Sequence, residues 1–97
     1  MLTIINQIWE ISNKATANNY DSLSRNLRRI NTEFEDMGYT LIDPIGRKYK
    51  DTDADLEANI ATKLHSKSKV VKVLKPIIYC AENGQNKLVQ KGIVIVE

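Results

Sequence analysis

An apolar seam within residues 21–37 constrains the fold of this 97-residue chain more than any other feature. Five apolar residues recur there with steps of four, three, four and three, the heptad-like spacing of one face of a helix. The pattern predicts an amphipathic helix that ends at Gly38 in a left-handed C-cap. Asp21 or Ser22 is expected to cap its N-terminus. The seam consists of Leu23, Leu27, Ile30, Phe34 and Met37.

A second helix is predicted upstream, over residues 2–18. Its apolar residues also recur in steps of four, three and four, and two further residues widen the stripe into a face too broad for one small neighbour to cover. The two asparagines in residues 16–20 favour turns and should break the helical pattern. The stripe consists of Ile4, Ile8, Ile11 and Ala15, widened by Ile5 and Trp9.

The face of the second helix opposite the seam is polar and is expected to be exposed. Arg28 and Arg29 are expected to pair with acids such as Glu33 or Asp36 on the same or a neighbouring helix. The alternative is that they hold a nucleic-acid phosphate. The polar face consists of Arg25, Arg28, Arg29, Asn31 and Glu35.

From residue 39 the pattern changes to strands separated by turn signals. Pro76 should interrupt a strand or mark an edge or bulge, and the Asn83-Gly84 pair is typical of a hairpin turn. Gly92 allows a bend or a close approach of the backbone. The predicted strands are residues 39–42, 70–74 and 77–80, with residues 88–89 and 93–96 as the return strand, and residues 43–46 form a turn.

The chain is therefore predicted to be α+β, with a helical dimerisation region over residues 1–38 and a small all-β domain over residues 39–97. Its size limits burial to about 60–65% of the surface that the unfolded chain exposes. Cys80 is the only cysteine and His65 the only histidine, so no internal disulfide or Cys/His zinc cage is available. We therefore expect association as the route to stability, and a reducing cytoplasm as the location.

No motif predicts catalysis or metal binding. The alternating aspartates of residues 51–55 suggest calcium, but an EF-hand loop that starts at Asp51 needs Gly and Glu where Leu56 and Thr62 stand. Residues 51–64 are therefore expected to form an exposed turn with a capping aspartate. Cys80 is expected to be a small buried apolar residue. Nothing in the sequence indicates a pocket that would tune carboxylates for acid–base chemistry. We expect neither an enzyme nor a bound cofactor.

The formal net charge of +2 is unevenly distributed along the chain. Residues 63–97 carry seven lysines and two glutamates, while residues 1–46 carry a net −2. The basic segment fits an acidic partner, nucleic acid or simply a solvated lysine-rich face. Polar residues interrupt the apolar N-terminal helix, so we expect no membrane span and no signal peptide.

Several segments together resemble the GrpE family, the nucleotide exchange factors of DnaK-type chaperones. This sequence departs from the family pattern where Leu56 replaces a histidine, Gln90 replaces an arginine and Lys91-Gly92 replaces Pro-Ala, and the long N-terminal stalk is absent. The resembling segments are Ile4–Ala15 (a short helix), Leu23–Met37 with Gly38-Tyr39 (the last helix and its exit), Gly46–Tyr49 ("G-x-x-F"), Glu57-Ala58 ("E-A"), Val70–Leu74 ("V-V-E-V-L") and Lys87–Val96 ("R-V-L-R-P-A-x-V-x-V").

The resemblance implies a homodimer in which two helices from each subunit form a four-helix bundle. The alternative is a helical hairpin that lies on the sheet of its own chain. The expected dimer interface is Ile4, Ile8, Trp9, Ile11, Leu23, Leu27, Ile30, Phe34 and Met37.

The resemblance also implies a function: the β domain binds the nucleotide-binding domain of a DnaK-like or actin-like ATPase and promotes ADP release. Matching positions assign partner contacts to Tyr49, Glu57, Lys87 and Gln90. The first alternative is a dimeric scaffold that has lost exchange activity. The second is a small nucleic-acid binder that uses the basic C-terminal segment.

Overall fold

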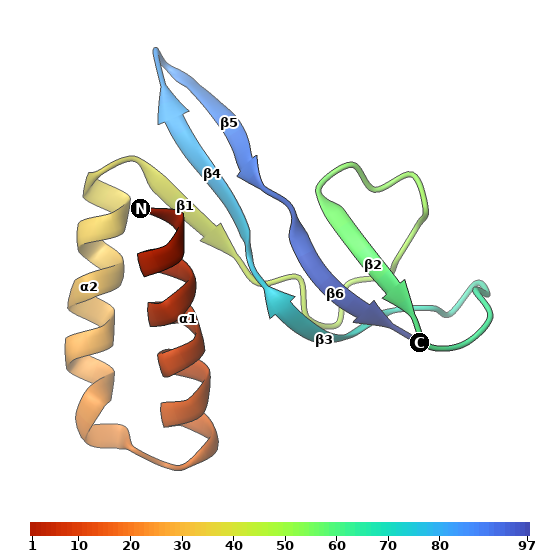
Figure 1. Cartoon of the computed structure of the whole chain (residues 1–97), viewed down its shortest axis with the longest axis horizontal. Helices are drawn as coiled ribbons and strands as arrows, with labels where there is room; N and C mark the ends of the chain where they lie inside the picture. Colours follow the sequence, from red (N-terminus) through yellow and green to blue (C-terminus); the bar gives the residue numbers. More distant parts are fainter. The chain divides into compact units, whose positions relative to one another are not determined.

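The computed structural model describes all 97 residues and has two compact units, Met1–Tyr39 and Thr40–Glu97 (Figure 1). We call them the helical unit and the β unit. Two N-terminal helices precede six strands in two sheets, so the predicted α+β class is confirmed. The elements are α1 (Leu2–Ala17), the 3₁₀ turn η1 (Asp21–Leu23), α2 (Ser24–Asp36), β1 (Tyr39–Ile42), β2 (Leu56–Ile60), β3 (Val70–Lys75), β4 (Ile77–Glu82), β5 (Gln85–Gln90) and β6 (Gly92–Val96).

The predicted break after the first helix is confirmed at its two asparagines. Asn19 adopts a φ of 59°, in the left-handed region that asparagine tolerates. The backbone N–H and the side-chain amide of Asn18 both donate to the Lys14 carbonyl, at 3.0 and 2.7 Å. These bonds satisfy a carbonyl that the end of the helix would otherwise leave without a donor.

The start of α2 corrects the capping prediction. The chain enters this helix through η1, the N-cap residue is Leu23, and no side chain caps the helix. Asp21 and Ser22 lie within η1 instead, and the Asp21 carbonyl accepts a hydrogen bond from Ser24 Oγ at 2.8 Å. At the other end Gly38 has a φ of 92°, so the predicted left-handed glycine is confirmed.

The β unit is a long hairpin whose two arms change sheet. The sheets have the strand orders β1-β4-β5 and β2-β6-β3. Asn83 and Gly84 connect β4 and β5 with φ values of 52° and 77°, as a type I′ turn requires, so the predicted turn is confirmed. The arms pass between sheets at Pro76 and Lys91. The Gln90 side-chain amide donates to the Pro76 carbonyl at 2.9 Å and braces this corner. The expected single return strand is therefore two strands, β5 and β6.

The strand β2 was not predicted, because residues 51–64 were expected to form an exposed turn. The turn is present only at its start, where Asp53 Oδ2 accepts the Lys50 backbone N–H at 3.0 Å. Residues Leu56–Ile60 then run parallel to β6. Pairing with a distant strand is a tertiary effect that local turn signals do not report.

A three-residue repeat in β3 is accommodated by two irregularities in its pairing with β6. The sequence Val-Val-Lys-Val-Leu-Lys cannot place every lysine outside in a regular strand, where faces alternate with period two. Val71 and Leu74 are each an extra residue in the register, as in a β-bulge, and both are exposed. The bulges reset the alternation, so the lysines stay out of the core.

The core of the β unit lies against one face of the β2-β6-β3 sheet. Gly92 belongs to this packing, because an added Cβ there would lie 2.9 Å from Ile77 Cγ1 and 3.0 Å from Leu56 Cδ2. The predicted close approach at Gly92 is therefore confirmed. The core consists of Leu56, Val70, Ile77, Val94 and Val96, with Tyr49, Ala58, Val73 and Tyr79 packed against it.

Candidate interaction surfaces

Two of the four predicted partner contacts lie near the β2-β6-β3 sheet. Glu57 is exposed on β2, opposite Ile93 of β6, on the face that points away from the core. Tyr49 follows a segment that pairs with the start of β3, and its backbone N–H donates to the Ser68 carbonyl at 3.0 Å. Its side chain packs against the core and is only half-exposed. Glu57 is thus more available to a partner than Tyr49.

The other two predicted contacts, Lys87 and Gln90, lie on β5, in the second sheet. Lys87 Nζ lies 3.3 Å from Glu82 Oε2 across the hairpin, and both side chains are well exposed. An exposed pair of this kind adds little stability and separates readily. Gln90 is half-buried and uses its amide within the corner described above.

Sequence reasoning missed a charge pair that ties the loop before β2 to the start of that strand. Arg47 contacts Asp55 with both guanidinium NH groups, at 2.6 and 3.0 Å, and lies 3.9 Å from Asp53. The Asp55 carbonyl in turn accepts the Gly92 N–H at 2.9 Å. Arg47 is the only arginine of the β unit, and its planar fork suits two-point contact with a carboxylate. A single arginine close in sequence to several aspartates is the one sequence signal that points to this pair.

The same contact shifts the ionisation of both partners. The hydrogen bond from Arg47 is the main cause that lowers the pKa of Asp55, against the opposing effect of desolvation. The bond to Asp55 likewise raises the pKa of Arg47. Both groups are therefore charged at neutral pH, and the pair acts as a structural clamp on the loop.

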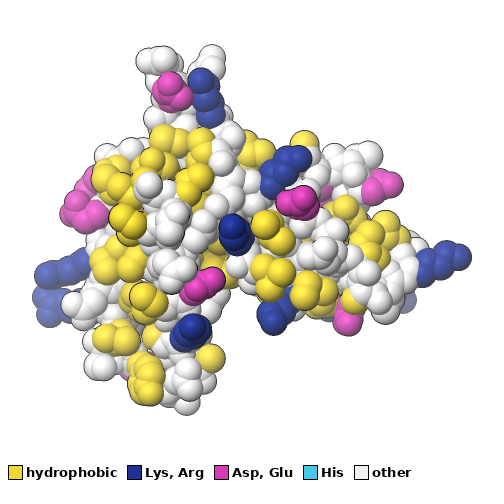
Figure 2. Space-filling model, viewed as in Figure 1, with side chains coloured by type: hydrophobic (Ala, Val, Ile, Leu, Met, Phe, Trp, Pro, Cys, Tyr) yellow, Lys and Arg dark blue, Asp and Glu magenta, His cyan; other side chains and the backbone are white.

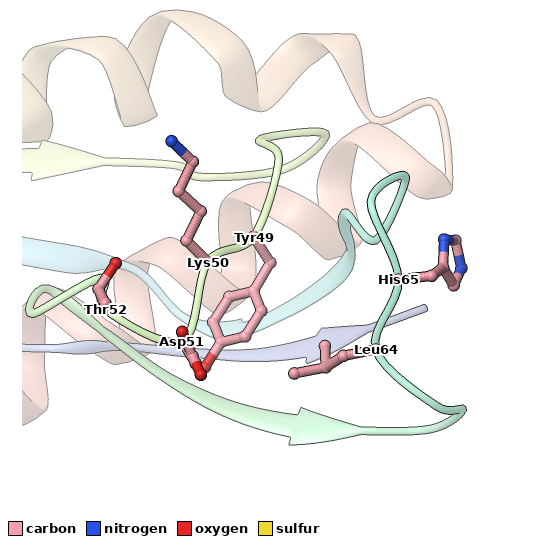
Figure 3. A pocket seen from close by; sticks show the side chains of 6 residues that line it. All are labelled: Tyr49, Lys50, Asp51, Thr52, Leu64 and His65. Atoms are coloured by element: carbon pink, nitrogen blue, oxygen red, sulfur yellow. The ribbon is translucent and has the colours of Figure 1, made fainter.

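A shallow depression of about 400 Å³ lies beside this loop (Figure 3). Figure 3 shows the side chains of Lys50 and His65 pointing away from the Tyr49 ring. His65 Nδ1 accepts the Lys67 backbone N–H at 3.1 Å, which orients the exposed imidazole. Nowhere in the chain do three or more His, Cys, Asp or Glu residues gather closely enough to hold a metal ion. The depression is lined by Tyr49, Lys50, Asp51, Thr52, Leu64 and His65.

The predicted dimer residues of the helical unit differ in exposure. Four are exposed: Ile4 at 57%, Ile11 at 44%, Leu23 at 40% and Met37 at 48%. Phe34 is buried within the single chain, at 4%. Figure 2 shows hydrophobic side chains gathered on the visible face of the helical unit. The remaining predicted residues are half-buried: Ile8, Trp9, Leu27 and Ile30.

The arginines of α2 do not make the expected ion pairs. Arg28 and Arg29 are exposed, and neither lies within 4.0 Å of a carboxylate oxygen, so the expected pairing with Glu33 or Asp36 is wrong within the single chain. Long exposed side chains lose conformational entropy in such pairs and gain little in water.

No helix has both the length and the apolar character needed to cross a membrane. No family model, curated protein or solved structure matches the chain. Any assignment of function therefore depends on the residues and surfaces described above.

Proposed function

We propose that this chain is a GrpE-like adaptor that acts as a homodimer. Its β unit binds the nucleotide-binding domain of a DnaK-like or actin-like ATPase and promotes ADP release. The observation that carries the proposal is the order of the two units: a helical hairpin with exposed apolar residues precedes a small β unit with its own core. This order agrees with the sequence resemblance to GrpE. The lone Cys80 is compatible with a reducing, cytoplasmic location.

The mechanism requires no bond making or breaking by this protein. The adaptor binds the open, nucleotide-poor state of the ATPase more tightly than the closed state and so shifts the equilibrium towards opening. Reciprocity then requires that bound ADP weaken the binding of the adaptor by the same factor. An adaptor with equal affinity for both states would leave ADP release unchanged.

The proposed dimer interface is the apolar face of α1 and α2, because two helices alone cannot cover it. The variant Ile4→Glu/Ile11→Glu should be monomeric in analytical ultracentrifugation at concentrations where the wild type is dimeric. Thr3→Glu/Gln7→Glu adds the same charge at exposed polar positions of α1 and should remain dimeric. Loss of the dimer in both variants, or in neither, would contradict this interface.

The proposed ATPase contacts are Tyr49, Glu57, Lys87 and Gln90. Glu57→Lys and Lys87→Glu are the informative substitutions, because both side chains are exposed and removing either leaves no buried group unpaired. Each should weaken the ATPase complex by about tenfold, since a reversed charge replaces attraction by repulsion. Lys63→Glu, at an exposed loop position, is the matched control and should leave affinity unchanged.

Exchange itself is tested by stopped-flow release of fluorescent ADP from candidate DnaK-like and actin-like ATPases. The proposal expects acceleration that saturates with adaptor concentration and is reduced by Lys87→Glu. Absence of acceleration with every ATPase that binds the protein would reject exchange activity.

A second candidate function is a dimeric scaffold with a GrpE-like shape and no exchange activity. The geometry of β5 favours it, because the Gln90 amide is engaged with the Pro76 carbonyl and Lys87 lies beside Glu82. Two of the four proposed contacts thus already have partners within the chain. Binding to an ATPase without faster ADP release would support this candidate over the first.

A further inference from the structure

The outer face of the β2-β6-β3 sheet has an apolar centre. Ile93 and Ile95 lie on the central strand β6 and alternate with Val94 and Val96, which face the core. Val71 and Leu74, the two bulge residues of β3, adjoin them and are 38% and 39% exposed. In a bulge, two residues oppose one on the partner strand, so each bulge adds an aliphatic side chain beside an isoleucine.

One flank of this centre is a row of lysines. Lys72 and Lys75 pair with Ile95 and Ile93, and Lys69 exchanges backbone hydrogen bonds with Glu97 at 2.9 and 3.1 Å. The three lysines thus oppose every second residue from Ile93 to Glu97 and lie about 7 Å apart along the sheet. Lys48 extends the row, because it is bridged to Lys69 on the other side. We call the four aliphatic residues and these lysines the lysine-flanked face.

None of these four lysines has a carboxylate partner within 4.0 Å. Of the acidic residues of this face, Glu57 lies on β2, across β6 from the lysines, and Glu97 follows β6 and is paired through its backbone with Lys69. The face is therefore basic along β3 and apolar in the middle, with one glutamate on β2 and one after the end of β6. Such an arrangement favours a partner that is apolar with an acidic flank.

We propose that the lysine-flanked face docks an amphipathic helix of a partner protein, with carboxylates along one flank and aliphatic side chains over Ile93 and Ile95. Helices are the elements that commonly cover the apolar face of a sheet. Carboxylates at positions i, i+4 and i+8 of a helix lie about 6 Å apart, close to the spacing of the lysines. Glu57, one of the proposed ATPase contacts, lies on the same face, but this inference does not rest on nucleotide exchange.

The character of the face favours a protein partner over single-stranded nucleic acid. Nucleic-acid platforms stack bases on exposed aromatic rings. Here the centre is aliphatic. Tyr49 and Tyr79, the tyrosines nearest to these lysines in the sequence, pack against the core instead. The backbone of the central strand β6 is paired on both sides, so at the centre of the face a partner can contact only side chains.

The test measures binding of fluorescein-labelled peptides by anisotropy to the full chain. The first peptide has about 18 residues, enough to form a helix, with a leucine stripe and glutamates at i, i+4 and i+8 on one flank. The second has lysines in place of these glutamates. We expect the acidic peptide alone to bind, and its affinity to fall with added salt, because the lysines are exposed.

Two charge-matched variants locate the binding. Lys72→Glu/Lys75→Glu should weaken the acidic peptide by about tenfold or more, because two attractions become repulsions. Lys14→Glu/Arg25→Glu makes the same change in net charge at exposed positions of α1 and α2 and should leave the affinity unchanged. Equal weakening by both variants would show that only net charge matters and would overturn the proposal.

Two further measurements show whether a loss of binding comes from misfolding of a variant and whether the apolar centre takes part. Amide chemical shifts of the wild type on addition of the acidic peptide should change at Ile93 and Ile95, without any substitution. Val71→Ser/Leu74→Ser should weaken binding while the lysines remain. The helix partner would be rejected if the acidic peptide did not bind. It would also be rejected if a single-stranded oligonucleotide bound more tightly than the peptide and Lys72→Glu/Lys75→Glu abolished that binding.

Discussion

The two units of this chain hide their apolar side chains to very different extents. In the helical unit only Ile5 is completely buried, whereas the β unit has a set of completely buried residues around Ile77 and Val94. Two helices share a single seam and cannot enclose a core, but two small sheets joined by a folded hairpin can. The difference teaches that the β unit encloses a core of its own, while the helical unit leaves apolar side chains exposed, as the proposed dimer requires.

The largest expected effect is the loss of a core side chain from the β unit. Ile77→Ala should lower the free energy of unfolding by about 2–5 kcal/mol, because Ile77 is fully buried and its removal leaves a cavity. Urea denaturation followed by circular dichroism measures the change. Ile60→Ala, on an exposed position of β2, is the control and should cost about 0.5 kcal/mol or less. Equal costs at the two sites would show that burial of Ile77 gives the β unit no particular stability, which would remove its side of the comparison.

A smaller effect is expected from crowding the same core. Gly92→Ala should cost about 1–3 kcal/mol, since the added Cβ would lie 2.9 Å from Ile77 Cγ1 and the neighbours must shift. The neighbouring exposed residue provides the control: Lys91→Ala should change the unfolding free energy by about 0.5 kcal/mol at most. A neutral Gly92→Ala would mean that the corner of the hairpin is loosely packed.

The Arg47–Asp55 clamp should contribute still less to the free energy of unfolding, and this contribution should be lost at acidic pH. Asp55→Asn should cost about 0.5–1 kcal/mol at pH 7, as for a partly exposed pair. The folded-state pKa of Asp55 lies below the unfolded value of about 3.9, so this contribution is complete above that value. As the pH falls through the folded-state pKa, the carboxyl is protonated in both states and the contribution is lost.

The measurement is therefore the unfolding free energy of wild type and Asp55→Asn as a function of pH. The two curves should converge as the solution becomes more acidic than about pH 4. In an Asp55→Asn background, Arg47→Gln should cost little more, because the pair is already broken. A gap that stays constant with pH would show that Asp55 stabilises the fold without its charge.

The smallest effect is expected on the exposed face of the helical unit. In solutions dilute enough to hold monomer, Ile11→Ser should change the unfolding free energy by about 0.5 kcal/mol or less, because the side chain is already 44% exposed. Thermal unfolding at several protein concentrations separates this from a dimer effect. A large loss that is independent of concentration would place Ile11 in the interior of the single chain and would contradict the contrast between the units.

The sequence was informative where structure is local. The helical period of the seam, the left-handed Gly38 and the Asn83-Gly84 turn each depend on a few neighbouring residues. The missed features are non-local: β2 exists because β6 pairs with it, and the division of the return strand into β5 and β6 needs two separate sheets. The hydrophobic period of a strand alone does not show which strand it pairs with or in which register.

The candidate surfaces follow the same division. The exposed apolar residues of the helices follow from their spacing, as with Ile4 and Ile11. The engagement of Gln90 with the Pro76 carbonyl was beyond sequence reasoning, since the two groups meet only when the hairpin turns its corner. A lysine-rich face was among the expectations from the sequence, but its apolar centre was not, because the bulges at Val71 and Leu74 set the register of the strand.

The parallel pairing of β2 with β6 also has a consequence for the order of folding. Leu56 pairs with Gly92 and Ile60 with Val96, so every contact of this pair closes a long loop, whereas β4 and β5 are joined by a two-residue turn. Local hairpins form in about 1–10 μs, and non-local pairings are slower because loop closure must come first. We expect the β4–β5 hairpin to form early and β2 to dock last, so the rate at which this domain matures is set by the one strand that joins it in parallel.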